Sequence, residues 1–285
     1  MQTVQTVETL RSQVKTFKQA GKSIAFVPTM GNLHTGHLEL VKVAKTKADV
    51  VIASIFVNPM QFGANEDLDS YPRTLEEDSQ ALAELGVNLL FTPTPEIMYP
   101  KGLAVQTFVE VPNVSALYCG QSRPVHFRGV TTIVNKLFNL VQPDVACFGE
   151  KDFQQLSLIK TMVEDLSLPI EIIGVPTKRE SSGLAKSSRN GYLTEVQKQQ
   201  ATVLYQSLTL AKAEVDQGNL NFAALKAQIQ QKIETAGLVV DYVEFADAKS
   251  LQPATEDSES VVLLLAAYLG KTRLIDNQVL FTKKP

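Results

Sequence analysis

The sequence predicts an α/β fold: a doubly wound, Rossmann-like parallel sheet followed by a smaller C-terminal α+β domain. In the first two thirds of the chain, apolar β-branched runs alternate with segments of helical period. The runs are continuously apolar, as expected of parallel strands covered by helices on both faces. After about residue 176 the order changes to two helical segments and then two strand-like runs. We therefore expect two domains, residues 1–176 and residues 177–285.

Each expected element corresponds to its own run of residues. The strands of the parallel sheet are the apolar runs at residues 23–28, 50–57, 88–92, 144–149 and 170–176. The helical segments between them are residues 38–48, 74–85, 130–141 and 153–166. In the second domain the helices are residues 195–216 and 221–236, and the strands are residues 238–247 and 260–269. These last two strands could pair as antiparallel neighbours.

The composition excludes several classes of protein. The 285-residue chain is 44% hydrophobic, enough for a sizeable core, and its net charge of −3 gives no general attraction to nucleic acid or to an anionic membrane. The longest apolar run, residues 261–269, is too short to cross a bilayer, and the N-terminus lacks a signal-peptide core. Cys119 and Cys147 have no metal-type spacing and fit a reducing cytosol. We expect a cytoplasmic globular protein without nucleic-acid or membrane partners.

The segment PTMGNLHTGH, residues 28–37, follows the apolar run SIAFV and precedes a helical segment. Ligands of doubly wound folds bind at the carboxyl ends of strands, so this segment should line a cleft. Gly31 and Gly36 let backbone N–H groups approach a ligand, and the start of a helix favours phosphate. Histidines at i and i+3 share one side of a helical turn, so His34 and His37 can converge on one anion.

Two roles stay open for these histidines. In a purely structural role, one ring would cap the turn and the other would pack on the sheet. In a ligand-binding role, the positive end of the helix favours neutral rings that donate a hydrogen bond, unless the phosphates restore the second proton. The combination of two histidines with two glycines at a strand-to-helix junction favours the ligand-binding role.

Five segments resemble a known family. Residues 34–37 form an H-x-G-H pattern similar to the nucleotide-binding signature of the nucleotidyltransferase superfamily. The segments FVNPMQF (56–62), RPVHFRGVTTIVNKLFN (123–139), FGEKDFQQ (148–155) and GLAKSSRNGYL (183–193) follow in order. Together they closely resemble the pantothenate synthetase (pantoate–β-alanine ligase) family, from near Met1 to GKTRLIDNQ (270–278).

The resemblance implies an ATP-dependent ligase. Pantoate and ATP would give pantoyl adenylate and pyrophosphate, and β-alanine would then displace AMP to give pantothenate. The resemblance also implies a homodimer that requires Mg²⁺. Two alternatives are a nucleotidyltransferase that stops at the adenylylated product and a nucleotide-sensing module that binds ATP without turnover. AMP release that depends on β-alanine would distinguish the ligase from both.

The pantoate site implied by the resemblance combines two amides with an apolar wall. Gln61 and Gln155 can each donate and accept hydrogen bonds, which suits a substrate with two hydroxyls and a carboxylate. The wall for its two methyl groups would come from Met30, Phe62, Val134 and Leu137. Plain core packing on a helical stripe is the alternative for Val134 and Leu137.

The nucleotide site should lie beyond Gly149, which ends a strand, so that Lys151 and Asp152 project into the cleft of the two histidines. Lys151 suits phosphate charge, and by resemblance Asp152 accepts a hydrogen bond from the ribose. Residues 186–189 resemble a mobile phosphate-clamping loop of a lid domain. The implied ATP-binding residues are Met30, His34, His37, Gly149, Lys151, Asp152, Lys178, Lys186, Ser187, Ser188 and Arg189. The catalytic group, which would neutralise charge on the leaving pyrophosphate, is His34, His37, Lys151, Ser187, Ser188 and Arg189.

Both segments have an alternative interpretation. Lys151 and Asp152 could form a solvated turn, and residues 186–189 could be an exposed basic linker between domains. Three residues depart from the family pattern: Lys186 replaces the usual Met or Leu, Lys178 an apolar residue, and Ser182 an Asp. These departures bear on nucleotide affinity and on the behaviour of the loop.

Glu77 and Asp78 fall where the family places carboxylates near Mg²⁺. A helix capped by Thr74 with an acidic first turn would explain the same residues without a metal. Arg123 and His126 also match the family pattern. We expect Arg123 to contact phosphate or to support the site from behind, and His126 to be a structural hydrogen-bond donor.

Overall fold

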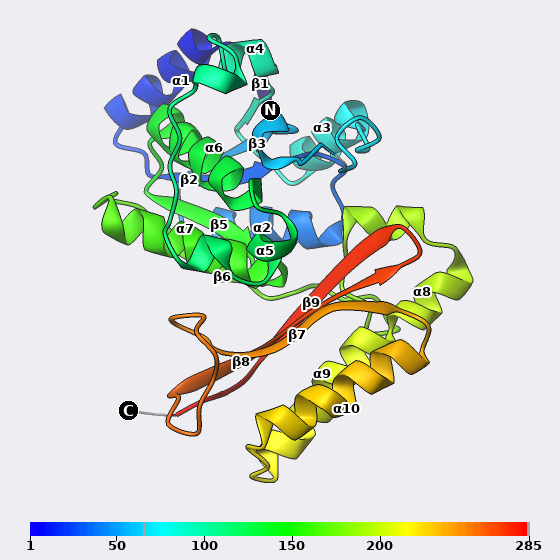
Figure 1. The fold of residues 1–285 in the computed structure, drawn as a ribbon. Coiled ribbons are helices and arrows are strands. Elements are labelled where there is room, and N and C mark those ends of the chain that lie inside the picture. The colour runs from blue at the N-terminus through cyan, green and yellow to red at the C-terminus, as the bar shows by residue number, and fades with distance from the viewer. Residues whose placement is uncertain (65, 284–285) are drawn as a thin grey trace. The chain divides into compact units, whose positions relative to one another are not determined.

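The computed structural model describes residues 1–64 and 66–283, which form two compact units. The first unit comprises Met1–Glu150 with Gln155–Pro176, and the second comprises Lys151–Gln154 with Thr177–Pro285. The first unit contains a parallel sheet flanked by helices, and the second contains a long antiparallel sheet with helices beside it (Figure 1). The second unit therefore takes a short segment from the turn after the fifth strand in addition to the C-terminal part of the chain.

The parallel sheet has six strands in the order β1-β4-β3-β2-β5-β6. Their bounds are β1 (Gln2–Val4), β2 (Ile24–Thr29), β3 (Val50–Ile55), β4 (Leu89–Phe91), β5 (Val145–Gly149) and β6 (Glu171–Val175). From β2 the chain moves outward through β3 to β4 and then returns to β5 on the other side of β2. The strand order thus switches between β2 and β5, the position at which open sheets bind ligands.

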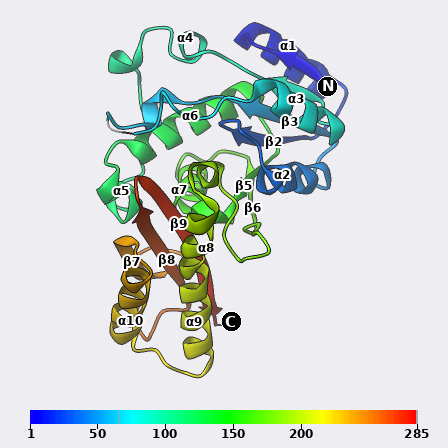
Figure 2. The same ribbon diagram turned by 90° about the vertical axis from the view of Figure 1, so that its right-hand side faces the viewer.

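Helices cover both faces of this sheet. Their bounds are α1 (Val7–Gln19), α2 (Thr35–Lys45), α3 (Leu75–Glu84), α6 (His126–Val141) and α7 (Phe153–Asp165). One face packs Ala25 and Val27 against Val41 of α2 and Leu82 of α3 in a single core cluster. On the opposite face Phe26 meets Phe138 of α6 edge to face, 6.5 Å between ring centroids. Figure 2 shows α2 and α6 on opposite sides of the strands.

Short helices fill the connections between the elements of the parallel sheet. They are α4 (Pro95–Met98), α5 (Cys119–Ser122) and the 3₁₀ turns η1 (Pro59–Gln61), η2 (Leu103–Val105), η3 (Val114–Ala116) and η4 (Glu150–Asp152). Of these, η1 follows β3 and η4 follows β5, so both lie beyond carboxyl ends of strands.

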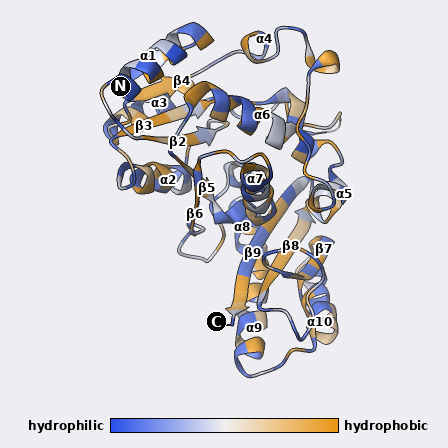
Figure 3. Ribbon diagram, turned by 90° about the vertical axis from the view of Figure 1, so that its left-hand side faces the viewer, coloured by the Kyte–Doolittle hydropathy of each residue, from blue (hydrophilic) through white to orange (hydrophobic). Residues whose placement is uncertain are grey.

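The second unit is built on an antiparallel sheet in the order β7-β8-β9. Its elements are η5 (Ser188–Tyr192), α8 (Glu195–Ala201), α9 (Val203–Asp216), α10 (Phe222–Thr235), β7 (Val239–Asp247), β8 (Ser260–Leu269) and β9 (Thr272–Thr282). The central strand β8 is buried almost along its whole length and is coloured as mostly hydrophobic in Figure 3, whereas α9 and α10 carry both colours. Leu208, Ile229 and Leu265 belong to its core cluster.

The predicted fold class is confirmed, and the expected strands and helices are present with small shifts of their ends. Helix α2 begins at Thr35 rather than at residue 38, because His34 caps it. The helix expected at residues 195–216 is two helices, which meet at Thr202. Strands β1 and β9 and helix α1 were not predicted, and β9 is interrupted by polar residues that have partners in the fold. Within the described residues, no helix has the length and apolar character needed to cross a membrane.

Candidate active site

Asp78 holds the turn that leads to the two histidines. After β2 the chain passes through Gly31 (φ +83°) and Asn32 (φ +50°), both in the left-handed region. The Asp78 carboxylate, in a residue only 3% exposed, accepts hydrogen bonds from the backbone N–H groups of Asn32 (2.8 Å) and Leu33 (2.7 Å). A buried carboxylate with two backbone donors fixes the path of the chain into His34.

The histidines form a reciprocal cap at the start of α2. His34 is the N-cap residue, and its Nδ1 accepts a hydrogen bond from the N–H of Gly36 (3.1 Å). His37 Nδ1 accepts from the backbone N–H of His34 (3.3 Å). Because both Nδ1 atoms accept hydrogen bonds, each neutral ring carries its proton on Nε2 and can donate only from that atom.

The rings of His34 and His37 stack with their centroids 4.1 Å apart, so the i, i+3 spacing does bring them together. The structural role that the sequence left open is also present, since His34 caps the turn. The cap and the ligand-binding role are compatible, because the cap uses Nδ1 and leaves the proton on Nε2. Both residues are partly exposed.

The amide of Gln61 has a defined orientation. Asn58 Oδ1 accepts a hydrogen bond from the hydroxyl of Tyr99 (2.6 Å), and its Nδ2 donates to the carbonyl of Gly129 (3.1 Å). These two contacts fix the Asn58 amide, whose Nδ2 also donates to Gln61 Oε1 (3.0 Å). The Gln61 Nε2 group therefore faces the other way, toward Met30 Sδ (3.2 Å).

Tyr99 and Asn58 are functional candidates that the sequence reasoning did not select. Burial raises the pKa of Tyr99, which keeps its hydroxyl protonated as the donor to Asn58. Asn58 lies within the FVNPMQF segment, and its side chain caps η1 just before a proline. That capping pattern was the available signal, but the contact with Tyr99, 41 residues away, could not be inferred from the sequence.

Helix α6 supports Gln61 from behind. A Cβ at Gly129 would lie 2.4 Å from the Met60 carbonyl oxygen and 2.6 Å from the Gln61 backbone, so only glycine allows this approach. His126 Nδ1 lies 3.0 Å from the Gln61 carbonyl oxygen, and since a carbonyl can only accept, the ring donates. Arg123 pairs with Glu66, with Nε 2.9 Å from Oε1. These contacts agree with supporting roles for His126 and Arg123.

The other residues of the expected pantoate site also lie in the first unit. Phe62 is buried and meets Tyr71 edge to face, 5.9 Å between centroids. Val134 and Leu137 are buried on α6, and Gln155 is partly exposed near the start of α7. The described contacts bring Met30 to Gln61 directly, but they include no hydrogen bond from Gln155 to the other members of this group.

In the second unit, Lys151 and Asp152 form the turn η4 together with Glu150 of the first unit. The Lys151 ammonium lies 3.9 Å from the Asp152 carboxylate, whose side chain is 48% exposed. The Lys151 carbonyl accepts a hydrogen bond from Asn277 Nδ2 (2.7 Å). This ion pair is therefore loose, and the Asp152 carboxylate faces solvent.

Residues 186–189, which the resemblance implies are a mobile phosphate-clamping loop, lie where a hairpin ends and a 3₁₀ turn begins. Residues 178–186 pair through the bridge of Arg179 with Ala185 and the hydrogen bond from Lys186 N to the Lys178 carbonyl (2.9 Å). The Ser187 side chain then caps η5 by accepting from Arg189 N (3.3 Å). The four residues 186–189 are all partly exposed, so their side chains are within reach of a ligand.

Lys186, the departure from the family pattern, has an acidic partner. Its ammonium lies 3.4 Å from Glu180 Oε1, on the opposite strand of the same hairpin. The side chains are 33% and 26% exposed, so solvent screens this attraction. The second departure, Lys178, is exposed. At the third, Ser182 Oγ accepts from Leu184 N (3.4 Å) within the hairpin turn.

Of the two carboxylates that the resemblance places near Mg²⁺, Asp78 already has protein donors, whereas Glu77 faces solvent. Both oxygens of Asp78 accept backbone N–H groups, and Oδ2 also accepts from the Thr74 hydroxyl (3.2 Å), while Glu77 is exposed. In the described part of the chain, no group of three or more His, Cys, Asp or Glu side chains could hold a metal ion. Asp78 therefore has a structural task, which is to hold the turn before His34.

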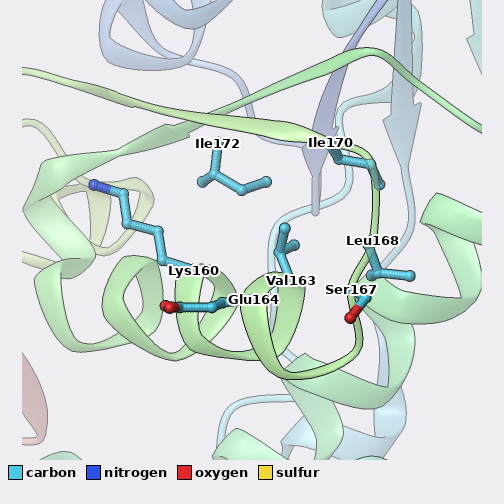
Figure 4. Close-up of a pocket in the computed structure, with 7 residues that line it drawn as sticks. All are labelled: Lys160, Val163, Glu164, Ser167, Leu168, Ile170 and Ile172. Carbon is cyan, nitrogen blue, oxygen red and sulfur yellow. The ribbon is translucent and has the colours of Figure 1, made fainter.

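An open hollow elsewhere on the first unit is separate from these residues (Figure 4). It lies between the C-terminal part of α7 and the start of β6. Its lining residues are Lys160, Val163, Glu164, Ser167, Leu168, Ile170 and Ile172. None of these seven belongs to the predicted sites, and the hollow is at the amino end of β6, whereas ligands of such sheets bind at carboxyl ends.

Comparison with known proteins identifies the relatives of this chain. The family model described as pantoate-beta-alanine ligase matches residues 2–279. A curated pantothenate synthetase of Shewanella halifaxensis is 60% identical over 279 residues, covering 98% of each chain. One of Colwellia psychrerythraea is 58% identical over 282 residues, covering 97% of this chain and 98% of the relative.

Solved structures give the same result. A pantothenate synthetase of Thermus thermophilus superposes with a TM-score of 0.90 at 42% identity, covering 99% of this chain and 100% of the other. A pantoate-beta-alanine ligase of Francisella tularensis, crystallised with beta-gamma ATP and beta-alanine, has a TM-score of 0.82 at 38% identity and covers 98% of each chain.

Proposed function

Since this chain belongs to the pantoate–β-alanine ligase family, and is an enzyme of that type, we propose that it condenses pantoate with β-alanine through a pantoyl adenylate. In the first step a pantoate carboxylate oxygen attacks the α-phosphorus of ATP, and the bond to the β-phosphate breaks to release pyrophosphate. In the second step the amine of β-alanine attacks the acyl carbon. The acyl–phosphate oxygen bond breaks, AMP leaves, and the nitrogen loses a proton as the amide forms.

The observation that carries this proposal is the reciprocal histidine cap. Its Nδ1 contacts leave the proton of each neutral ring on Nε2, so that His34 and His37 can donate from Nε2 beyond the carboxyl end of β2. Fixed donors stabilise charge that develops on a leaving pyrophosphate without any cost of reorganisation. The N-terminus of α2 adds its own positive potential.

The same unit supplies the pantoate site in this proposal. The oriented Nε2 of Gln61 donates to a hydroxyl or carboxylate oxygen of pantoate, while the Gln155 amide provides a second polar contact. The apolar groups that would face the two methyl groups are Met30, Phe62, Val134 and Leu137. We assign the edge of α6, rather than its buried stripe as a whole, to this contact.

From the second unit, Lys151 and Arg189 supply positive charge for the phosphates, and Ser187 and Ser188 supply hydroxyl donors. Asp152 would accept from the ribose, while Lys178 and Lys186 would add further charge near the nucleotide, with Met30 and Gly149 contributing from the first unit. Because the adenylate is prone to hydrolysis, we propose that this unit acts as a lid that excludes water.

Mg²⁺ enters the proposal only as the counterion of ATP. Asp78, which the resemblance places near Mg²⁺, already accepts two backbone N–H groups, so we assign it to the turn before His34 rather than to the metal. We further propose that the protein is a cytoplasmic homodimer, as the family resemblance implies, without nucleic-acid or membrane partners.

The test is product identity with the full substrate set. The purified protein is incubated with ATP, Mg²⁺, pantoate and β-alanine, and pantothenate, AMP and pyrophosphate are quantified. We expect the three products in equal amounts, with AMP release dependent on β-alanine. An adenylylated product without β-alanine-dependent AMP would indicate a nucleotidyltransferase, and ATP binding without pyrophosphate would indicate a sensing module.

A further inference from the structure

Two neighbouring residues of β9, Asp276 and Asn277, are polar and buried. They are 4% and 9% exposed, in a strand whose neighbours Leu274 and Leu280 belong to the core cluster. A buried carboxylate or amide is costly unless it is fully hydrogen-bonded. Their partners therefore explain why polar residues occur at these positions.

Asp276 binds Arg179, which lies at the base of the hairpin that leads to residues 186–189. Its two carboxylate oxygens accept from Arg179, at 2.6 Å to Nη1 and 2.9 Å to Nη2. Arg179 Nη1 also donates to the Gly183 carbonyl (3.1 Å), and its guanidinium stacks on the Tyr205 ring, 4.4 Å from the centroid. One planar cation thus joins the first strand of the hairpin, its turn and strand β9.

Asn277 binds the turn that contains Lys151, the other cationic segment of the proposed phosphate site. Its Nδ2 donates to the carbonyl of Lys151 (2.7 Å), which lies 126 residues earlier in the chain. Side chains of adjacent strand residues point to opposite faces, so Asp276 and Asn277 form their hydrogen bonds on opposite faces of β9. Consecutive Cα atoms are about 3.8 Å apart, which makes the shared strand a short, stiff spacer between the two segments.

We propose that Asp276 and Asn277 are positioning residues, which together fix where Lys151 and residues 186–189 stand relative to each other for phosphate binding. This inference rests on the proposed function of those residues. A buried ion pair is not needed for stability alone, since apolar residues of similar volume often serve as well or better. A role in placing two charged segments accounts for both polar residues at once.

The same strand offers a matched control. Arg273 of β9 pairs with Asp241 of β7, with Nε and Nη2 at 2.9 and 2.6 Å from Oδ2. The two side chains are 14% and 17% exposed, and Arg273 lies over the Tyr242 ring, as Arg179 lies over Tyr205. This pair joins β7 to β9 rather than the hairpin to β9, so Asp241→Asn breaks a similar Arg–Asp–Tyr arrangement within the sheet.

The experiment compares Asp276→Asn, Asn277→Leu and Asp241→Asn with the parent enzyme. Melting temperature, affinity for a non-hydrolysable ATP analogue, affinity for pantoate and the rate of pantoyl adenylate formation are measured for each. We expect Asp276→Asn and Asp241→Asn to lower the melting temperature by similar amounts. Only Asp276→Asn and Asn277→Leu should slow adenylation and weaken binding of the analogue, each about tenfold or more, with pantoate affinity unchanged.

Asn277 should act through Lys151. In a Lys151→Met background, Asn277→Leu should therefore produce little further loss of adenylation rate, whereas independent effects would multiply. If Asp276→Asn does not fold, Asn277→Leu still tests the inference, because it removes the hydrogen bond to the Lys151 carbonyl without breaking a buried ion pair. Adenylation and analogue binding that change no more than in Asp241→Asn would overturn the inference.

The proposed function can fail separately. A parent protein that binds the ATP analogue but forms no adenylate would contradict the ligase mechanism. The affinity comparison among the three variants would still decide whether Asp276 and Asn277 position the phosphate-binding segments.

Discussion

At the scale of single residues, His34 has a structural task and, in the proposed function, also a chemical one, and the two use different ring atoms. Nδ1 caps α2, and Nε2 carries the proton that we assign to phosphate. His34→Asn keeps a side-chain acceptor for the cap but removes the Nε2 donor, whereas His34→Ala removes both. We expect adenylation to fall roughly 10²–10³-fold in each variant, the scale for one transition-state donor.

Stability separates the two histidine variants. His34→Ala should lose about 1 kcal/mol of unfolding free energy with the cap, and His34→Asn should lose much less. Urea unfolding and single-turnover adenylation measure the two effects. If His34→Asn adenylates at near the parent rate, His34 is a cap and nothing more.

A substitution at Gln61 should weaken the binding of pantoate and leave the binding of ATP unchanged. Gln61→Ala removes an oriented donor and leaves Asn58 Nδ2 without this acceptor, so pantoate binding should weaken by about 1–3 kcal/mol. Affinity for ATP should survive, because Gln61 is assigned to the acid substrate. Calorimetric titration with each substrate measures both, and a comparable loss of ATP binding would mean that the pantoate site has been misplaced.

At the scale of elements, the turn between β2 and α2 depends on Asp78. Asp78→Asn replaces an acceptor by an NH₂ group that faces a backbone N–H, and we expect a loss of about 1–3 kcal/mol in unfolding free energy and impaired adenylation. Glu77→Gln, one residue earlier and exposed, is the matched control and should change neither property. A clear rise in the Mg²⁺ concentration required by Glu77→Gln would restore a metal role to this helix.

In the hairpin of the second unit, the Glu180 carboxylate would compete with a bound triphosphate for the Lys186 ammonium. If Lys186 also attracts the triphosphate, Lys186→Met should raise the apparent ATP KM several-fold at low salt, and the difference should shrink as ionic strength rises. Glu180→Gln should shift the KM in the opposite direction, because it removes the competing carboxylate. Lys151→Met should instead damage kcat.

Steady-state kinetics over a range of salt concentrations test this prediction. A Lys186→Met variant that matches the parent at every salt concentration would show that Lys186 is only the partner of Glu180. Phosphate binding in the second unit would then depend on Lys151 and Arg189.

The elements that could be predicted are those whose signal is local. The strands β2, β3 and β5 are continuous apolar runs, and their helices have a clear 3.6-residue period. Strand β9 was missed because Asp276 and Asn277 interrupt its apolar pattern, and they are tolerated only because Arg179 and Lys151 meet them in the fold. The start of α2 was missed because histidine is an unusual N-cap residue.

At the scale of the whole molecule, the sequence predicts that His34 follows β2 and Lys151 follows β5, as they do in the fold, but it does not reveal the distant residues that orient the candidate side chains. The pairing of His34 with His37 follows from spacing along one helical turn. The orientation of Gln61 depends on Tyr99, which lies 41 residues from the Asn58 amide that it fixes. The turn before His34 depends on Asp78, which accepts a hydrogen bond from the N–H of Leu33, 45 residues away. Such contacts arise from tertiary packing and have no local pattern.

In the proposed function, one chain carries out two chemical steps through a retained acyl adenylate. The most direct test mixes the enzyme with ATP, Mg²⁺ and pantoate without β-alanine, quenches the mixture on the millisecond to second scale, and analyses it by mass spectrometry. We predict a burst of up to one pyrophosphate per active site with an equal amount of bound pantoyl adenylate, which later addition of β-alanine converts to pantothenate and AMP. Full turnover in the presence of β-alanine, but no adenylate in its absence, would contradict the account.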